Sequence, residues 1–375
     1  PSLTQTYALF RGDPEKFFIH LSGVHGVEGY AGSSIQFAVL KYLETSQLYA
    51  NKETAKKLPT LLFVHAVNPF GFHHNRRTNE DNIDLNRNFL TNEEFVFVRN
   101  RDPNYSGYVD LDDLLNPTKM PFENPYLNDV YWLFHAAKAI LKSGFISIKR
   151  AMVAGNYHKQ KGYGFGGFQR SASANNLIQY VQDLNIPSTA KYFYLLDVHT
   201  GLGPSGVDTL MFDHVDDVDW IESVYPTEID KKGKIVGGIK SFSFGATSPL
   251  SSQPEGEEAK NKNTATNADA AAVSSGYDLT VGTVYALCET FAASHLDGKR
   301  RVCFSQEFGT VPPFYAGKGA IEENYAHWYG NEREKRVYKD RYRPLFYVET
   351  REWKRRVVSR GLLAFVQTLN YLIEA

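Results

Sequence analysis

The sequence has few cysteines, and this lack removes two classes of protein. Its 375 residues include only Cys288 and Cys303. Two cysteines exclude a scaffold of several disulfides and a CxxC metal knuckle. Sparse thiols flanked by apolar residues favour a reducing compartment, so we expect a cytoplasmic protein, while a single disulfide between the two stays open.

Long apolar runs are also lacking. No uninterrupted run approaches the roughly 20 residues that a membrane-spanning helix requires, so we expect no membrane partner. No signal peptide is visible at the N-terminus. Because the chain begins with Pro1 rather than methionine, an upstream targeting segment stays open.

The sequence also lacks a surplus of either positive or negative charge. The 41 basic and 42 acidic side chains leave a net charge of -1. Nucleic-acid binding usually shows a basic surplus, so we expect no nucleic-acid partner. The densest basic stretch, residues 331–356, is interleaved with acids, which is typical of a solvated helix face with local ion pairs. The sequence leaves the oligomeric state open.

The sequence does contain enough apolar material, 42% of its residues, for a sizeable core. Short apolar runs alternate with amphipathic stretches, which predicts an α/β fold. Strands are predicted at residues 17–22, 61–67, 192–198 and 301–305, and helices at residues 31–43, 129–141 and 353–373.

Three stretches interrupt this alternation. Residues 100–125 are rich in Asn, Asp and Pro, residues 159–169 are rich in Gly and Tyr, and residues 251–275 contain almost no large apolar side chain. None resembles a linker between independent domains. We therefore expect a single domain over residues 1–375, with these three stretches as loop excursions.

Chemically reactive side chains follow the predicted strands, at the sheet edge where open α/β folds bind ligands. His25 and Glu28 follow the first strand, within Gly23-Val-His-Gly-Val-Glu-Gly29. Imidazole nitrogens and carboxylate oxygens both suit Zn²⁺, although a histidine packed near a helix start gives the same short pattern. His199 follows the strand at residues 192–198 and completes a His-Glu-His set. Three protein ligands with one open position are what a catalytic zinc requires.

Two further segments carry arginines and a carboxylate. Residues 75–89 are dense in Arg and Asn, and arginine offers a planar fork for carboxylate oxygens. The run Asp84-Leu-Asn-Arg-Asn-Phe89 is too specific for an ordinary surface turn with Arg–Asp pairs. Glu307 follows the strand at residues 301–305, where a carboxylate can act as a general base toward metal-bound water. A buried, paired structural glutamate is the equally weighted alternative.

Together these segments resemble the zinc carboxypeptidases of the carboxypeptidase A type. Residues 84–89 look like the substrate-carboxylate motif of that family, and the remaining motifs follow in the family's order. In detail the chain is most similar to a branch known as a domain of unknown function, through Ser-Gly-Val-His-Gly-Val-Glu-Gly, Asp-Val-His-Thr-Gly-Leu-Gly and Glu-Phe-Gly-Thr. The resemblance implies an α/β fold of three layers, with a central twisted, mostly parallel but mixed sheet flanked by helices.

The resemblance also implies a role for each matching residue. His25, Glu28 and His199 would bind one Zn²⁺. Glu307 would be the general base and would later return its proton to the leaving amine. Asp84 would orient the imidazole of His25 from outside the ligand set.

Substrate contacts follow from the same resemblance. Asn86 and Arg87 would bind a free carboxylate of the substrate. Arg77, with Arg76 as the alternative, would polarise the scissile carbonyl and stabilise its oxyanion. The Trp-Arg-Lys-x-Arg context of the family's oxyanion arginine is absent, so the choice between the two stays open.

The family's mobile capping tyrosine has no unambiguous match. Tyr277 is the first candidate and Tyr285 the second. For both, packing is the more typical role.

The implied function is that of a zinc metallopeptidase that cleaves an amide or peptide bond next to a free carboxylate. Its substrate would be a peptide or an N-acyl amino acid. An aspartoacylase-like deacylase is the alternative, although such enzymes usually add a carboxy-terminal β-domain where this chain has a predicted helix. A non-catalytic cleft-binding module is a third reading, and it would be expected to lack a ligand or the base.

Overall fold

The computed structural model describes all residues except 1–2, 186–189, 214–217, 242–248, 250–278 and 292–299. Its centre is a seven-stranded sheet with the strand order β1-β3-β2-β4-β9-β5-β8. The strands are β1 (Thr6–Phe10), β2 (Asp13–Ser22), β3 (Pro59–His65), β4 (Tyr192–Ser205), β5 (Asp208–Asp213), β8 (Ile239–Ser241) and β9 (Arg300–Gly309).

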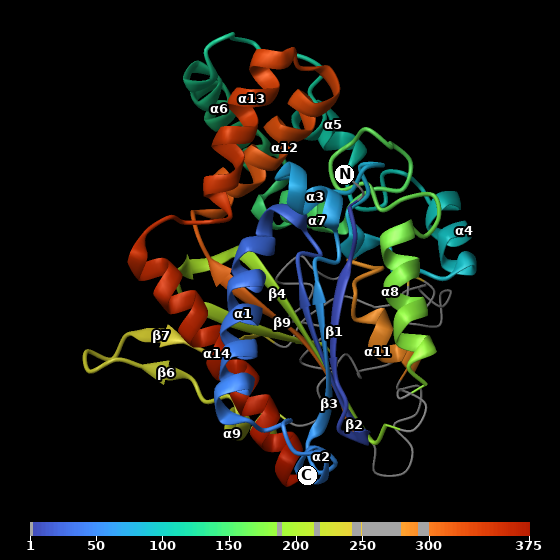
Figure 1. The fold of residues 1–375 in the computed structure, drawn as a ribbon. Helices are drawn as coiled ribbons and strands as arrows, with labels where there is room; N and C mark the ends of the chain where they lie inside the picture. The colour runs from blue at the N-terminus through green and yellow to red at the C-terminus, as the bar shows by residue number, and fades with distance from the viewer. Residues whose placement is uncertain (1–2, 186–189, 214–217, 242–248, 250–278, 292–299) are drawn as a thin grey trace, which may run out of the picture.

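The central strands β3, β2, β4 and β9 run parallel to one another. At the sides, β1 is antiparallel to β3, and β5 is antiparallel to β9. The predicted sheet, mostly parallel but mixed, is therefore confirmed. A separate hairpin of β6 (Glu228–Ile229) and β7 (Ile235–Gly237) projects to the left in Figure 1.

Side chains of β2 alternate between two cores, one on each face of the sheet. Phe17, Ile19 and Leu21 enter one core, and Phe18 enters the other. Helices α8 (Ala172–Asp183) and α11 (Ala286–Phe291) cover the first face, and α1 (Gly29–Ser46), α9 (Val218–Val224) and α14 (Arg351–Glu374) cover the second (Figure 1). The three predicted layers follow, and burial on both faces explains the unbroken apolar run at residues 17–19.

Further helices gather beyond the carboxyl ends of the central strands, at the top of Figure 1. They include α3 (Pro69–His74), α5 (Asp112–Leu115), α6 (Pro125–Ser143), α7 (Phe145–Ala154), α12 (Pro313–Tyr329) and α13 (Glu332–Tyr342). Two shorter connections contain α2 (Lys52–Ala55) and α4 (Asn92–Asn100).

The predicted loop excursions differ from one another. Residues 100–125 contain a 3-10 turn and α5, whereas residues 159–169 form no helix or strand. Residues 251–275 lie outside the described part of the chain. The division of residues 1–375 into a single domain stays a prediction.

Cys288 on α11 and Cys303 on β9 form a disulfide. This corrects the interpretation of the two cysteines as thiols that favour a reducing compartment, because neither side chain is a thiol here. Among the described residues, no helix is both long and apolar enough to cross a membrane.

Candidate metal centre

His25 and Glu28 lie in a tight turn between β2 and α1. Gly23 begins the turn at φ +69°, in the left-handed region that favours glycine. A Cβ on Gly26 would stand 1.9 Å from the backbone carbon of Gly71, so only glycine allows this approach to α3. Residues Gly26–Glu28 then form a 3-10 turn that leads directly into α1. The turn buries both side chains at the carboxyl end of the sheet.

His199 lies inside β4 rather than beyond its end, because β4 continues to Ser205. The fold nevertheless brings it to the turn. Nδ1 of His25 lies 3.0 Å from Oε1 of Glu28, and Nδ1 of His199 lies 3.0 Å from Oε2 of the same carboxylate. Ligand-type atoms of the three residues lie within 4.8 Å of one another, the one such group of three or more within the described ranges.

The outer nitrogens of both imidazoles face other carboxylates. Nε2 of His25 lies 3.0 Å from Oδ1 of Asp84, and Nε2 of His199 contacts Oδ2 of Asp197. When both imidazoles are neutral, as metal ligands must be, a proton on each Nε2 would satisfy these carboxylates and leave a lone pair on each Nδ1. Nδ1 of His25 is buried and makes no hydrogen bond to a described residue. Lone pairs that converge on a carboxylate are the arrangement that a bound cation satisfies, so the residues fit a metal ion.

Glu28 lies at the centre of this network. Its carboxylate also accepts hydrogen bonds from the backbone N–H of Thr200 at 3.0 Å and from Nη1 of Arg77 at 3.2 Å. Burial opposes ionisation, but His25 and His199 outweigh it and hold the pKa of Glu28 well below its usual range. Glu28 is therefore an anion throughout the neutral range, as a metal ligand requires.

The carboxylates outside the cluster are charged for similar reasons. Burial disfavours the Asp84 anion, yet Arg77 and His25 hold its pKa well below the usual range. For His199, burial disfavours the charged imidazole, but Asp197 and Glu28 raise its pKa well above the usual range. Without a metal, positive charge at His199 and Arg77 balances the surrounding carboxylates.

Arg77 and Arg76 point to different partners. Nε of Arg77 donates to Asp84 at 2.9 Å and Nη1 donates to Glu28, which places its guanidinium at the cluster. Arg76 is more deeply buried, and its Nε donates to Glu323 of α12 at 2.8 Å. Of the two arginines, Arg77 is therefore the one that borders the cluster.

Glu307 lies within β9, which continues to Gly309, so its strand was also predicted too short. Its Cα pairs with that of His199 on β4, and paired positions in a sheet present their side chains to the same face. Its Oε2 atom is buried without a hydrogen bond to a described residue. Burial, with Glu28 and Asp197, outweighs His199 and Arg77 and raises the pKa of Glu307 to about 8.

Asn86 and Arg87 follow Asp84 on a 3-10 turn. Oδ1 of Asn86 accepts a hydrogen bond from the backbone N–H of Val284 at 2.9 Å. Arg87 is buried; its Nε donates to the carbonyl of Val153 at 2.6 Å, and its Nη1 donates to the carbonyl of Asn86. Nη2 of Arg87 makes no hydrogen bond to a described residue, so part of the guanidinium fork is available to a ligand.

Of the two tyrosines considered from sequence, Tyr277 lies outside the described residues. Tyr285 is a packing residue here: it is buried, and its hydroxyl contacts Oγ of Ser305 at 2.7 Å. Two other tyrosines lie by the cluster. Tyr163 and Tyr342 pack with Val27, the residue before Glu28, and both interact electrostatically with Glu28 and Arg77.

Tyr342 is the more unusual of the pair, because its buried hydroxyl has no hydrogen-bond partner among the described residues. Sequence reasoning missed both tyrosines. The Gly/Tyr-rich composition of residues 159–169 was a signal for Tyr163. None existed for Tyr342, which stands in the basic helix α13.

Comparison with known proteins adds a family. The profile of a family described as "Protein of unknown function (DUF2817)" matches residues 4–231 and 243–360. No curated protein matches the chain.

Similar solved structures include the murein-tripeptide amidase MpaA from Escherichia coli O157, with 12% identity over 88% of this chain and 83% of that chain and a TM-score of 0.33. A "putative metallopeptidase" from Shewanella baltica OS155 shares 14% identity over 84% and 75%, with a TM-score of 0.30. Another "putative metallopeptidase", from Shewanella amazonensis SB2B, shares 13% identity over 87% of this chain and 81% of that chain, with a TM-score of 0.31. Similarity this low transfers no property to this chain.

Proposed function

This chain belongs to the DUF2817 family of unknown function, and we propose that it is a zinc-dependent hydrolase of an amide or peptide bond next to a free carboxylate. The expectation that it belongs to a family of unknown function is thereby confirmed. The proposed assignment as a hydrolase depends on the site itself.

One observation carries the proposal. Nδ1 of His25 and Nδ1 of His199 converge on the two oxygens of Glu28, while Asp84 and Asp197 occupy both Nε2 atoms. Three protein donors of nitrogen and oxygen type are what a catalytic zinc takes, with a fourth position left for water or substrate. Carboxylates behind the histidines fix the imidazole orientation and raise ligand basicity.

A zinc ion in this site would lower the pKa of a water from ~15.7 toward ~7 and polarise a carbonyl oxygen. Glu307 would take the proton from the attacking water, since it faces the same side of the sheet as His199 and has a free buried Oε2. Having taken that proton, Glu307 could return it to the leaving amine.

Arg77 and Arg87 would have different roles toward the substrate. Arg77, at the edge of the cluster, would donate to the oxyanion that develops on the scissile carbonyl. The unoccupied Nη2 of Arg87, with the amide of Asn86, would hold a carboxylate of the substrate. A carboxylate fixed beside the scissile bond restricts the substrate to a peptide end or an N-acyl amino acid.

Hydrolysis of a panel of peptides and N-acyl amino acids, with stoichiometric zinc and after chelation, tests the proposal. Zinc-dependent release of an amine from one class is expected. Activity on N-acyl amino acids alone would favour the deacylase chemistry over the peptidase. Zinc bound stoichiometrically with no turnover on any compound would overturn the hydrolase assignment and leave a binding module.

Glu307→Gln provides the companion test. Zinc content should stay at one equivalent while turnover collapses, because the base is lost and the metal ligands remain. Glu53→Gln, an exposed position on α2, is the matched control and should leave both unchanged.

A further inference from the structure

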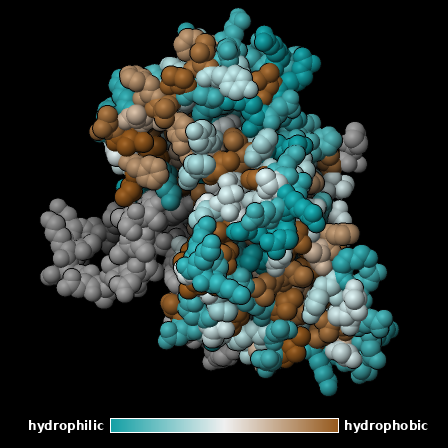
Figure 2. Space-filling model, turned by 90° about the vertical axis from the view of Figure 1, so that its left-hand side faces the viewer, coloured by the Kyte–Doolittle hydropathy of each residue, from teal (hydrophilic) through white to brown (hydrophobic). Residues whose placement is uncertain are grey.

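The outward face of α6 carries large apolar side chains exposed to solvent in the described part of the chain. Leu141 is 88% exposed, Tyr126 73% and Phe134 67%. Figure 2 shows apolar side chains gathered at the upper end of the molecule, the end that holds α6 in Figure 1. Contiguous exposed apolar patches of this kind are rare on monomers and mark binding surfaces.

Helix periodicity explains how these side chains form one stripe. Successive residues turn by about 100°, so positions three, four and seven apart share a face. The stripe consists of Tyr126, Leu127, Val130, Leu133, Phe134 and Leu141, all exposed. Asn128 and Trp132 occupy the opposite face, where both are buried.

Contacts on the buried face hold the stripe outward. Asp129 forms ion pairs with Lys318 of α12 at 2.6 Å and with Arg341 of α13 at 2.7 Å. Nδ2 of Asn128 donates to the hydroxyl of Tyr338 on α13 at 3.0 Å. Rolling α6 to bury the stripe would break all three contacts.

Positive charge borders the stripe. On α6 itself the basic residues are Lys138 and Lys142, and the acidic residue is Asp129. Lys138 and Lys142 are exposed on α6, whereas Asp129 is already paired. The neighbouring helix α13 has five basic and three acidic residues, although the whole chain has a net charge of -1. A local positive excess beside an apolar stripe is typical of helices that lie in a lipid interface.

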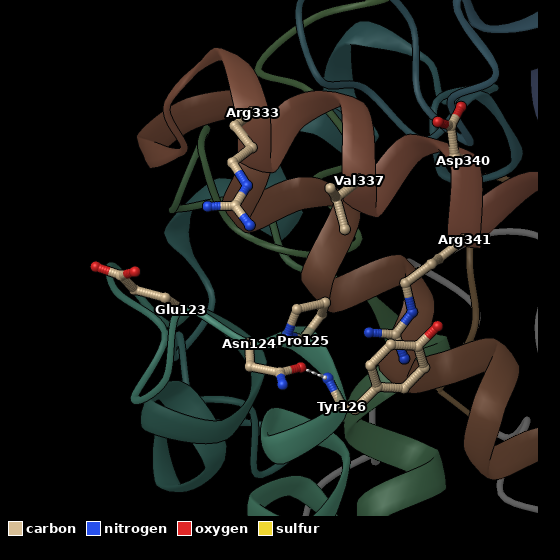
Figure 3. A pocket seen from close by; sticks show the side chains of 8 residues that line it. All are labelled: Glu123, Asn124, Pro125, Tyr126, Arg333, Val337, Asp340 and Arg341. Atoms are coloured by element: carbon tan, nitrogen blue, oxygen red, sulfur yellow. Dashed lines mark hydrogen bonds between the residues drawn. The ribbon is translucent and has the colours of Figure 1, made fainter.

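An open cavity of about 590 Å³ lies at the N-terminal end of the stripe, between α6 and α13 (Figure 3). The guanidinium of Arg341 stands 5.3 Å from the centre of the Tyr126 ring. The Arg333 side chain extends from α13 toward the segment that carries Glu123 (Figure 3). Its guanidinium makes no hydrogen bond to a described residue. Arg333 therefore presents a cation at this cavity, which Glu123 and Asp340 also line.

We propose that the α6 stripe docks on an anionic membrane surface. The apolar side chains enter the headgroup boundary, and Lys138, Lys142 and Arg333 contact lipid phosphates. A second copy of the chain is the alternative occupant, and the experiment below distinguishes it from a membrane. The expectation of no membrane partner came from the lack of a spanning helix, and surface docking does not require one.

Co-sedimentation with vesicles tests the proposal. We expect the full chain to bind vesicles of phosphatidylglycerol mixed with phosphatidylcholine, and to bind pure phosphatidylcholine vesicles weakly. Phe134→Glu should reduce the partition coefficient roughly tenfold or more, because a large apolar side chain no longer leaves water. Phe37→Glu is the matched control: Phe37 on α1 is 66% exposed, and its replacement should leave binding unchanged.

The double variant Lys138→Glu, Lys142→Glu should weaken binding to anionic vesicles, with Lys57→Glu as its control. Circular dichroism and zinc content verify that each variant is folded. The proposal is overturned if the parent chain binds neither vesicle type, or if Phe37→Glu and Phe134→Glu lower binding equally. Dimerisation abolished by Phe134→Glu, without vesicle binding, would instead assign the stripe to contact between copies.

Discussion

Glu307 on β9 pairs directly with His199 on β4, and its Oε2 atom is buried without a hydrogen-bond partner among the described residues. The pairing puts a carboxylate of raised pKa beside a proposed metal ligand on the same face of the sheet. In the metal-free protein, burial of Glu307 outweighs the charges of His199 and Arg77, which gives the pH dependence of stability a specific sign.

Glu307→Gln should stabilise the metal-free protein at high pH. The pKa of Glu307 rises on folding from 4.5 to about 8, so the folded state binds the extra proton between these values. The contribution of protonated Glu307 to the stability of the folded state is fully present below pH 4.5, and it is lost as the pH rises through 8. We expect denaturant unfolding to show that the free energy of unfolding of the variant, relative to that of the parent, increases by roughly 1–3 kcal/mol between pH 5 and 9.

Other titrating groups are common to both proteins and cancel in this difference. Glu53→Gln is the control, since Glu53 is exposed and its replacement should give no trend with pH. A difference between parent and Glu307→Gln that stays flat over the range would contradict the raised pKa.

Asp84→Asn should weaken zinc binding without removing a proposed ligand. Asp84 accepts from Nε2 of His25 and from Nε of Arg77, so the amide loses the charge that sets the imidazole's orientation and basicity. Partners of this kind typically contribute about 10–100-fold in metal affinity. Competition with a chromophoric chelator measures the affinity. Asp81→Asn, an exposed position in the same loop, should retain the parent value.

Arg77→Lys and Arg76→Lys should separate catalysis from stability. Arg77 borders the cluster, so its replacement should lower kcat about 10²–10³-fold with zinc retained. Arg76 is buried against Glu323, so its replacement should mainly lower the free energy of unfolding, by about 1–3 kcal/mol. Reversed effects, with kcat lost at Arg76 and stability at Arg77, would exchange the two roles.

The central strands could be predicted from sequence because they are buried on both faces and read as apolar runs. Their ends could not. The predicted strands stopped at Val198 and Ser305 because His199 and Glu307 look like polar strand ends, yet β4 and β9 continue past them. His199 is satisfied in the buried site by Glu28, a residue distant in sequence, and no local pattern reports such a contact.

In the site, too, some residues could be predicted from sequence and others could not. His25, Glu28 and Asp84 stand in motifs whose spacing is unusual, so the sequence marked them. Tyr342 carries no such mark, because tyrosine is common in this chain, with 23 residues. Only the fold brings α13 over Val27 and leaves the Tyr342 hydroxyl buried and unpartnered.

Tyr342→Phe should therefore divide stability from activity. Loss of a buried, unpartnered hydroxyl should leave the free energy of unfolding unchanged or raise it by up to about 1 kcal/mol. If the hydroxyl donates to substrate, kcat/KM should fall while zinc affinity stays constant. Tyr338→Phe is the contrasting control, because its hydroxyl accepts from Asn128 and its loss should cost stability with kcat/KM retained. Full activity in Tyr342→Phe would restrict Tyr342 to packing against Val27.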